Sequence, residues 1–122
     1  MIRKASTGII SVLAVICIVL LIYAYPYRWV LEKRVFDVGV QSIIQAADKL
    51  EHVQNLPDEI KSVKPVDVFI TDEGVYIQLD GFFVTAEGIF ILRESSNFNP
   101  EEQGDPFYRQ IESRLYWYYV TG

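Results

Sequence analysis

The sequence contains only one cysteine and one histidine, Cys17 and His52, and it carries few basic residues. One cysteine excludes an intramolecular disulfide framework, and one histidine excludes a histidine-rich metal site. Cys17 lies in an uncharged segment that is expected to cross a membrane, so it would not meet His52 in a Cys–His catalytic site. Eleven Lys and Arg residues against sixteen Asp and Glu residues give a net charge of −5. That balance argues against a protein that binds nucleic acid by neutralising phosphates.

Patterns that carry common chemistries are also missing. The glycines occur singly, so there is no glycine-rich phosphate loop, and no nucleophile-elbow pattern surrounds a serine. The acid–glycine pairs at 73–74, 80–81 and 87–88 lack the spacing of a calcium loop. A hydrolase that uses a pair of carboxylates ranks behind the two non-enzymatic functions described below, because nothing distinguishes one pair of acids from the rest. We therefore predict no enzymatic activity, no cofactor and no metal site.

A long uncharged segment near the N-terminus is the most informative feature that is present. Residues 9–24 read IISVLAVICIVLLIYA, and eleven of these sixteen residues are Ile, Leu or Val. With one residue added on each side, the segment would form about 27 Å of helix, a short span of a hydrocarbon layer about 30 Å thick. We predict an uncleaved signal-anchor, a single-pass transmembrane helix over residues 9–25 behind a short basic tail at 1–8.

Residues that favour the membrane interface follow this segment. Aromatic rings and positive charge gather there, at Tyr23, Tyr25, Tyr27, Arg28 and Trp29, which we predict to contact the headgroup region. The positive charges at the two ends nearly balance, but a short basic N-terminus favours a cytoplasmic N-terminus and an extracytoplasmic C-terminal domain. The alternative is a signal peptide cleaved after Ala24, although that position lacks a small-x-small pattern.

The rest of the chain is more acidic than the net charge of the whole sequence suggests. Residues 35–122 hold six Lys and Arg residues and fifteen Asp and Glu residues, a net charge of −9. Anionic headgroups repel such a domain, so we expect it to stand off the bilayer. An acidic surface also accelerates association with a basic partner and makes that association sensitive to salt.

Residues 26–57 are predicted to form a juxtamembrane amphipathic helix. Apolar residues that alternate spacings of four and three positions would share one face of this helix: Phe36, Val40, Ile43, Ala47 and Leu50, extended by Val53. Gly39 weakens this helix by about 1 kcal/mol relative to alanine, and Pro57 marks its end. The favoured interpretation is that this face covers a sheet. The alternative is a short coiled coil that would make a homo-oligomer, a dimer in its simplest form.

Residues 58–122 show the alternation typical of β-strands, most strictly at 75–80, where Val75, Ile77 and Leu79 are predicted to share one face. Strands are predicted at 66–71, 75–80, 82–85, 89–92 and 115–120, with the acid–glycine pairs as tight turns. Asp80-Gly81 has a second interpretation, a bulge inside one long strand. Asp105 and Pro106 resemble a helix start, so a short helix is predicted to Glu112.

Together these elements predict an α+β fold. A single transmembrane helix is followed by a long amphipathic helix that packs on a small antiparallel sheet of three to five strands. Residues 26–57 and 58–122 are expected to form one acidic domain beyond the membrane.

An aromatic segment near the C-terminus is the candidate partner-binding surface. It comprises Tyr116, Trp117, Tyr118 and Tyr119, and tyrosine and tryptophan are enriched at interface hot spots. In a strand these side chains alternate between the two faces of the sheet. The alternative interpretation is that both faces are covered, one by the helix and the other by the loop at 94–106.

These features favour a membrane-anchored, non-enzymatic protein-binding module. Its expected partners are the lipid bilayer and another protein, basic in character, and not a nucleic acid. One form would be an immunity or inhibitor protein that neutralises a basic toxin or enzyme, an analogy of architecture with no motif behind it. The alternative is an accessory subunit of a larger membrane complex. Its contacts would run through the transmembrane helix, where small residues step by three: Gly8, Ser11, Ala14 and Cys17.

Overall fold

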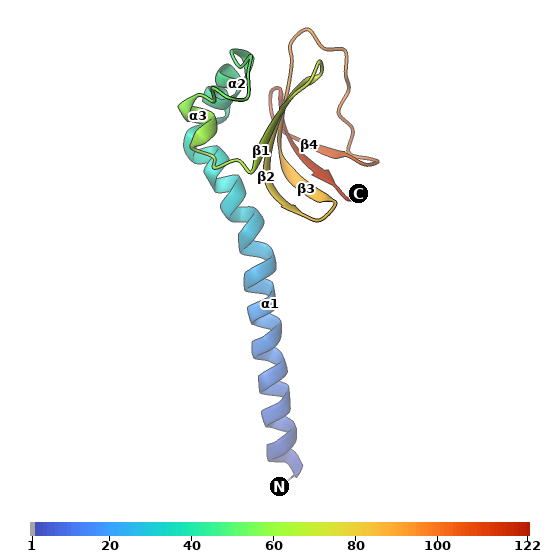
Figure 1. The fold of residues 1–122 in the computed structure, drawn as a ribbon. Coiled ribbons are helices and arrows are strands. Elements are labelled where there is room, and N and C mark those ends of the chain that lie inside the picture. Colours follow the sequence, from blue (N-terminus) through green and yellow to red (C-terminus); the bar gives the residue numbers. More distant parts are fainter. Residues whose placement is uncertain (1) are drawn as a thin grey trace. The chain divides into compact units, whose positions relative to one another are not determined.

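The computed structural model describes the backbone of residues 2–122 and the side chains of residues 8–21 and 28–122. Three helices precede five strands (Figure 1). The helices are α1 (Ile2–Val38), α2 (Val40–Asp48) and α3 (Asp58–Lys61). The strands are β1 (Asp67–Ile70), β2 (Gly74–Phe82), β3 (Thr85–Leu92), β4 (Phe107–Glu112) and β5 (Leu115–Val120). The chain divides into two compact units, residues 1–33 and 34–122, which are described separately.

In the first unit, α1 is one continuous helix through residue 33. Its apolar residues between Ile9 and Leu21 are exposed along the helix. Where side chains are described, no helix combines the length and the apolar character required of a membrane span.

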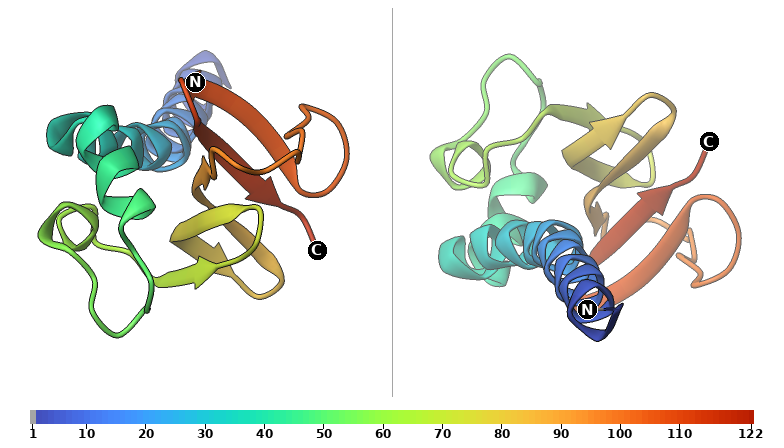
Figure 2. Two further views of the ribbon diagram at one scale, coloured as in Figure 1. Left: turned by 90° about the horizontal axis from the view of Figure 1, so that it is seen from above. Right: turned by 90° about the horizontal axis from the view of Figure 1, so that it is seen from below.

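In the second unit, all five strands form one antiparallel sheet with the order β1-β2-β3-β5-β4. The predicted α+β class is confirmed, and the sheet reaches the upper end of the expected strand number. Alternation in β2 is as predicted: Val75, Ile77 and Leu79 are all buried on one face. Figure 2 shows α2 and α3 on one side of the sheet and the chain between β3 and β4 on the other.

The predicted continuous helix over 26–57 is wrong, because the helical path breaks at Gly39 and ends at Asp48. Gly39 has a φ of +100°, which glycine adopts without the steric cost that other residues meet. The break shifts the buried face: Val35 is buried, whereas Phe36 is 55% exposed. Beyond the break Val40, Ile43, Ala47 and Leu50 are buried as predicted, and Val53 lies outside the helix and is exposed.

A charged hydrogen-bond network fastens the end of α2 to the sheet. The Arg114 guanidinium donates to both carboxylate oxygens of Asp48, at 3.0 and 2.7 Å, and to the carbonyl oxygen of Leu92 at 2.8 Å. A two-pronged arginine–carboxylate pair holds its partners in one orientation, which a single-point lysine contact does not. The helix layer is thereby fixed to the turn between β4 and β5.

Of the three acid–glycine pairs predicted to be turns, the first is confirmed: the chain reverses between β1 and β2 at residues 71–74, where the Thr71 backbone N–H donates to the carbonyl oxygen of Gly74 at 2.8 Å. The other two are wrong, because Gly81 lies inside β2 and Gly88 lies inside β3, while the reversal between β2 and β3 falls at residues 83–84. The register shifts between Gln78 and Asp80, which confirms the alternative interpretation of a bulge in one long strand. The segment 82–85, predicted to be a separate strand, is therefore the turn between β2 and β3 together with one paired residue on each side.

The predicted helix from Pro106 to Glu112 is also wrong, because this segment is strand β4, paired with β5. Asp105 does not cap a helix: its carboxylate accepts hydrogen bonds from the backbone N–H and the hydroxyl of Thr121, at 2.9 and 3.0 Å. The predicted last strand is confirmed as β5, and pairing with it outweighs the local helix-start signal.

Replacing Gly88 by alanine should destabilise the second unit by about 3 kcal/mol or more, because the added Cβ meets the carbonyl oxygen of Ile77 in the paired strand. The matched control is Gly81→Ala, where the Cβ meets the flexible end of the Gln78 side chain and should cost much less. Chemical denaturation of the full chain in detergent, followed by far-ultraviolet circular dichroism, measures both. Equal losses for the two variants would contradict the close-approach explanation.

Candidate functional site

The predicted partner-binding aromatics lie along β5, with alternate residues on opposite faces. Trp117 faces the helix side and is 2% exposed, and its indole N–H donates to Glu87 at 3.2 Å. Tyr118 faces the other side and is 3% exposed, whereas Tyr116 and Tyr119 are half-buried. Both faces of β5 are thus covered, as the alternative interpretation expected, and partner binding by these four residues stays a prediction.

The predicted membrane-interface residues divide into two sets. The side chains of Tyr23, Tyr25 and Tyr27 lie outside the described residues. Arg28 and Trp29 are described and lie on α1 in the first unit, and both are exposed.

A second aromatic cluster fills the sheet face opposite α2 and α3. Of its members, the sequence analysis named only Tyr116 and Tyr118 as candidate site residues. Phe90, Tyr108 and Tyr118 are buried at its centre, with partly buried apolar side chains packed around them: Tyr76, Leu92, Phe98, Tyr116 and Val120. Tyr76 stacks on Phe90 with ring centroids 4.4 Å apart. Each large ring removes much apolar surface from water, so a thin cover completes the face.

That cover is the chain between β3 and β4, and three contacts hold it in place. Phe98 packs edge-on against Phe90 and Tyr108, at centroid distances of 5.9 and 5.6 Å. The Tyr108 backbone N–H donates to the carbonyl oxygen of Glu101 at 2.8 Å. The bond from Asp105 to Thr121 fixes the end of the cover to the end of β5.

An open cleft of about 600 Å³ lies where this cover meets the sheet. Aromatic rings and carboxylates line it, together with small polar residues: Glu73, Tyr76, Phe98, Asn99, Glu101, Gln103, Gly104, Asp105, Pro106 and Tyr108. We call it the acidic–aromatic cleft. Among these described residues three are acidic and none is basic, so the cleft carries concentrated negative charge.

Hydrogen bonds join the floor of the cleft to its acidic rim. The Tyr76 and Tyr108 hydroxyl oxygens lie 2.7 Å apart, and the Tyr76 hydroxyl donates to Glu73 Oε2 at 3.3 Å. Burial raises the pKa of Tyr76 above its ordinary value, and the bond to Tyr108 raises it further. Burial also raises the pKa of Tyr108. Both phenols therefore stay neutral at physiological pH, and they present ring faces and hydroxyl groups rather than charge.

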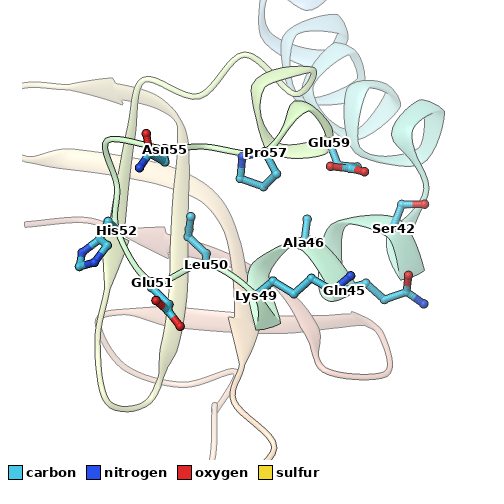
Figure 3. A pocket seen from close by; sticks show the side chains of 10 residues that line it. All are labelled: Ser42, Gln45, Ala46, Lys49, Leu50, Glu51, His52, Asn55, Pro57 and Glu59. Atoms are coloured by element: carbon cyan, nitrogen blue, oxygen red, sulfur yellow. The ribbon is translucent and has the colours of Figure 1, made fainter.

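A second hollow, of about 450 Å³, lies between α2 and the chain that leads to α3. We call it the α2 groove (Figure 3). Leu50, Ala46 and Pro57 point into the groove, while Glu51 and the His52 imidazole point away from it (Figure 3). His52 therefore lies at the rim as an exposed side chain. Lysine and glutamate side chains both border this groove, which leaves it without charge of one sign.

Metal ligands do not converge in the part of the chain that the structure describes: no three His, Cys, Asp or Glu side chains form a group able to hold an ion. The Cys17 side chain is exposed on α1. The arrangement that can act chemically is thus the acidic–aromatic cleft, through charge attraction and ring contacts with a cation.

Comparisons of the chain with protein-family models, with curated proteins and with solved structures found no match. Any function is therefore argued from the residues of the site.

Sequence reasoning missed the cleft because its residues are far apart along the chain. Glu73 was assigned to a turn, Tyr76 to the outward face of a strand, and Glu101 to a loop. The backbone N–H of Arg93 donates to the carbonyl oxygen of Glu73 at 2.9 Å, which fixes the start of the chain between β3 and β4 beside Glu73. The available signal was Tyr76, an aromatic residue on the strand face opposite the predicted core.

The buried tyrosines should make the second unit sensitive to alkali. Burial raises the pKa of Tyr118, so the folded state keeps a proton that the unfolded chain loses near pH 10. The contribution of Tyr118 to the free energy of unfolding is fully present below about pH 10, and it is lost as the pH rises above that value. Tyr118→Phe removes one such group, and its denaturation midpoint should fall less steeply between about pH 10 and 12. An unchanged slope would assign the alkaline sensitivity to other groups.

Proposed function

We propose that this chain is a single-pass membrane protein whose acidic domain binds a basic protein without catalysing a reaction. The acidic–aromatic cleft receives a lysine or arginine side chain of that partner. The observation that carries the proposal is the composition of the cleft: three carboxylates surround aromatic rings with no basic residue among the lining side chains.

A cation is the ligand that fits these groups best. Ring faces attract ammonium and guanidinium groups through their quadrupole, and carboxylates attract them by charge. Both carboxylate oxygens of Asp105 accept hydrogen bonds from Thr121, and Glu73 accepts one from the Tyr76 hydroxyl. These bonds hold the two negative charges in place. Glu101 is exposed at the rim and meets the incoming cation directly.

The magnitudes assign the cleft a role in selectivity and rate. An exposed ion pair contributes about 0–1 kcal/mol, and an exposed cation–π contact about 0.5–1 kcal/mol. Together these would alter a dissociation constant by about one order of magnitude. The cleft therefore steers and orients a basic partner, and the remaining affinity comes from the wider interface.

The uncharged segment at 9–24 supports membrane anchoring. Its composition favours insertion, and the aromatic and basic residues that follow it favour an interface position. We propose a cytoplasmic N-terminus with the acidic domain outside. Anchoring confines the domain to one surface, which raises its effective concentration towards partners on the same membrane.

A second candidate function is an accessory subunit that contacts a larger membrane complex through its helix. The small residues Gly8, Ser11, Ala14 and Cys17 favour it, since a helix can approach such a stripe closely. A Cβ at Gly8 would meet nothing within 4 Å, so the Gly8→Leu change adds bulk there without disturbing the helix itself. Under this alternative, Gly8→Leu with Ala14→Leu abolishes partner capture, whereas changes in the cleft do not.

Neutralising the cleft should weaken binding of cations. Glu73→Gln with Glu101→Gln removes two negative charges from the cleft, and Glu51→Gln with Glu59→Gln removes two from the border of the α2 groove as the matched control. We expect arginine methyl ester to shift the nuclear magnetic resonance signals of Tyr76 and Tyr108 in the wild type and the control. The cleft variant should bind it several-fold more weakly. Added salt should reduce binding in the wild type most.

The same two variants test the protein partner. Crosslinking of the full-length protein in its native membrane, at low and high salt, should capture a basic protein that high salt releases. Capture by the cleft variant should fall while the control retains it. If both variants lose capture equally, net charge and not the cleft is responsible. A hydrophobic partner retained at high salt would favour the accessory-subunit function.

Membrane anchoring has its own test. The full chain should remain in the membrane fraction after washing with alkaline carbonate, because the segment at 9–24 would lie among the lipid chains. A reporter fused to the C-terminus should be active only outside the cytosol. Release by carbonate, or a mature chain that begins at Tyr25, would contradict the anchor, and an active cytosolic reporter would reverse the orientation.

A further inference from the structure

The turn between β2 and β3 exposes three large apolar side chains side by side. Phe82 is 72% exposed, Phe83 is 92% exposed and Val84 is 71% exposed. We call residues 82–84 the hairpin tip. The two rings touch edge to face, with centroids 4.3 Å apart. The hairpin tip is the end of a two-residue reversal, so it is a convex apolar point and not a groove.

The needs of the fold do not explain a phenylalanine at position 83. Its φ is +55°, in the left-handed region where glycine and asparagine fit better and a bulky residue is strained. Its side chain is almost fully exposed, so burial within the domain does not offset that strain. A strained, exposed aromatic residue at a turn points to a role outside the domain.

The tip is also suited to an apolar environment. The segment Gly81–Ala86 carries no charge, and Phe82 pairs with Thr85 across the turn. The Thr85 hydroxyl donates to the Phe82 carbonyl oxygen at 2.7 Å, which satisfies a backbone acceptor inside the hairpin. Backbone groups that find partners internally are the condition for entering the hydrocarbon boundary of a membrane.

We propose that the hairpin tip inserts into the interfacial region of the bilayer and gives the acidic domain a second membrane contact. The inference rests on the proposed function, because anchoring is what keeps lipid within reach of the tip. The charge pattern favours lipid over a protein groove: no charged side chain at the tip could set the register of a polar interface. Phenylalanine and valine suit the acyl boundary instead.

Insertion should be shallow and should not require anionic lipid. Asp80 and Glu87 face each other across the ladder just behind the tip, and they keep the hairpin from going deeper. The surrounding domain is acidic, so anionic headgroups should hinder the approach. The tip therefore favours bilayers of zwitterionic phosphatidylcholine.

An environment-sensitive probe on the tip tests this in the full chain. In a Cys17→Ser background, Val84→Cys is labelled with a nitrobenzoxadiazole dye and the protein is reconstituted into phosphatidylcholine vesicles. We expect a blue-shifted emission that doxyl-labelled lipid quenches. Ser113→Cys, in the turn at the opposite end of β5, is the matched control and should show neither effect.

A second variant separates the tip from the probe. Adding Phe83→Asn keeps a residue that tolerates a positive φ, so the hairpin should remain folded while its largest apolar side chain is removed. The probe at position 84 should then lose the blue shift and the quenching. Circular dichroism verifies that this variant is folded.

The outcomes separate the two proposals. If carbonate leaves the protein in the vesicles but the probe at 84 behaves like the probe at 113, the tip proposal is overturned and the anchor stands. If carbonate releases the protein, the anchor is overturned, and the tip proposal with it. Quenching that persists after Phe83→Asn would show that the dye inserts on its own, and it would also overturn the tip proposal.

Discussion

The acidic domain depends on covering the sheet face that lies opposite α2 and α3. α2 and α3 cover one face, and the other must be shielded by the chain between β3 and β4. An irregular segment supplies little apolar surface of its own, so the sheet supplies it through aromatic rings. Phe90, fully buried, is the centre against which Tyr76, Phe98 and Tyr108 pack. Without that cluster the cover would have nothing to pack on.

The same solution creates the candidate site. Phe98 and Tyr108 hold the cover to the sheet, and they also line the cleft at its edge. Their positions are fixed by folding, before any ligand arrives, so a cation would not have to order them. Structural packing and ligand recognition thus share residues, which explains why the cleft is formed in the unbound chain.

Sequence reasoning succeeded where one local pattern decided the outcome. Val75, Ile77 and Leu79 alternate strictly, and burial of one sheet face requires that pattern. It failed where a distant strand decided. Gly88 pairs with Gln78 inside the sheet, where the Ile77 carbonyl leaves no room for a side chain, and Asp105 accepts hydrogen bonds from Thr121 instead of capping a helix. The cleft was missed for the same reason, since contacts between distant segments and not the local sequence place Glu73 and Glu101 in one cleft.

Charge and apolar contact act over different distances, and together they would restrict the acidic domain. Repulsion of a domain with net charge −9 from anionic lipid extends over about 8 Å at physiological salt, whereas burial of an apolar tip requires direct contact. A single helical anchor allows rotation about its axis. A second contact at the hairpin tip would remove that freedom and select one orientation. The cleft would then present its carboxylates to partners from a fixed direction, which favours rapid encounter with a basic surface.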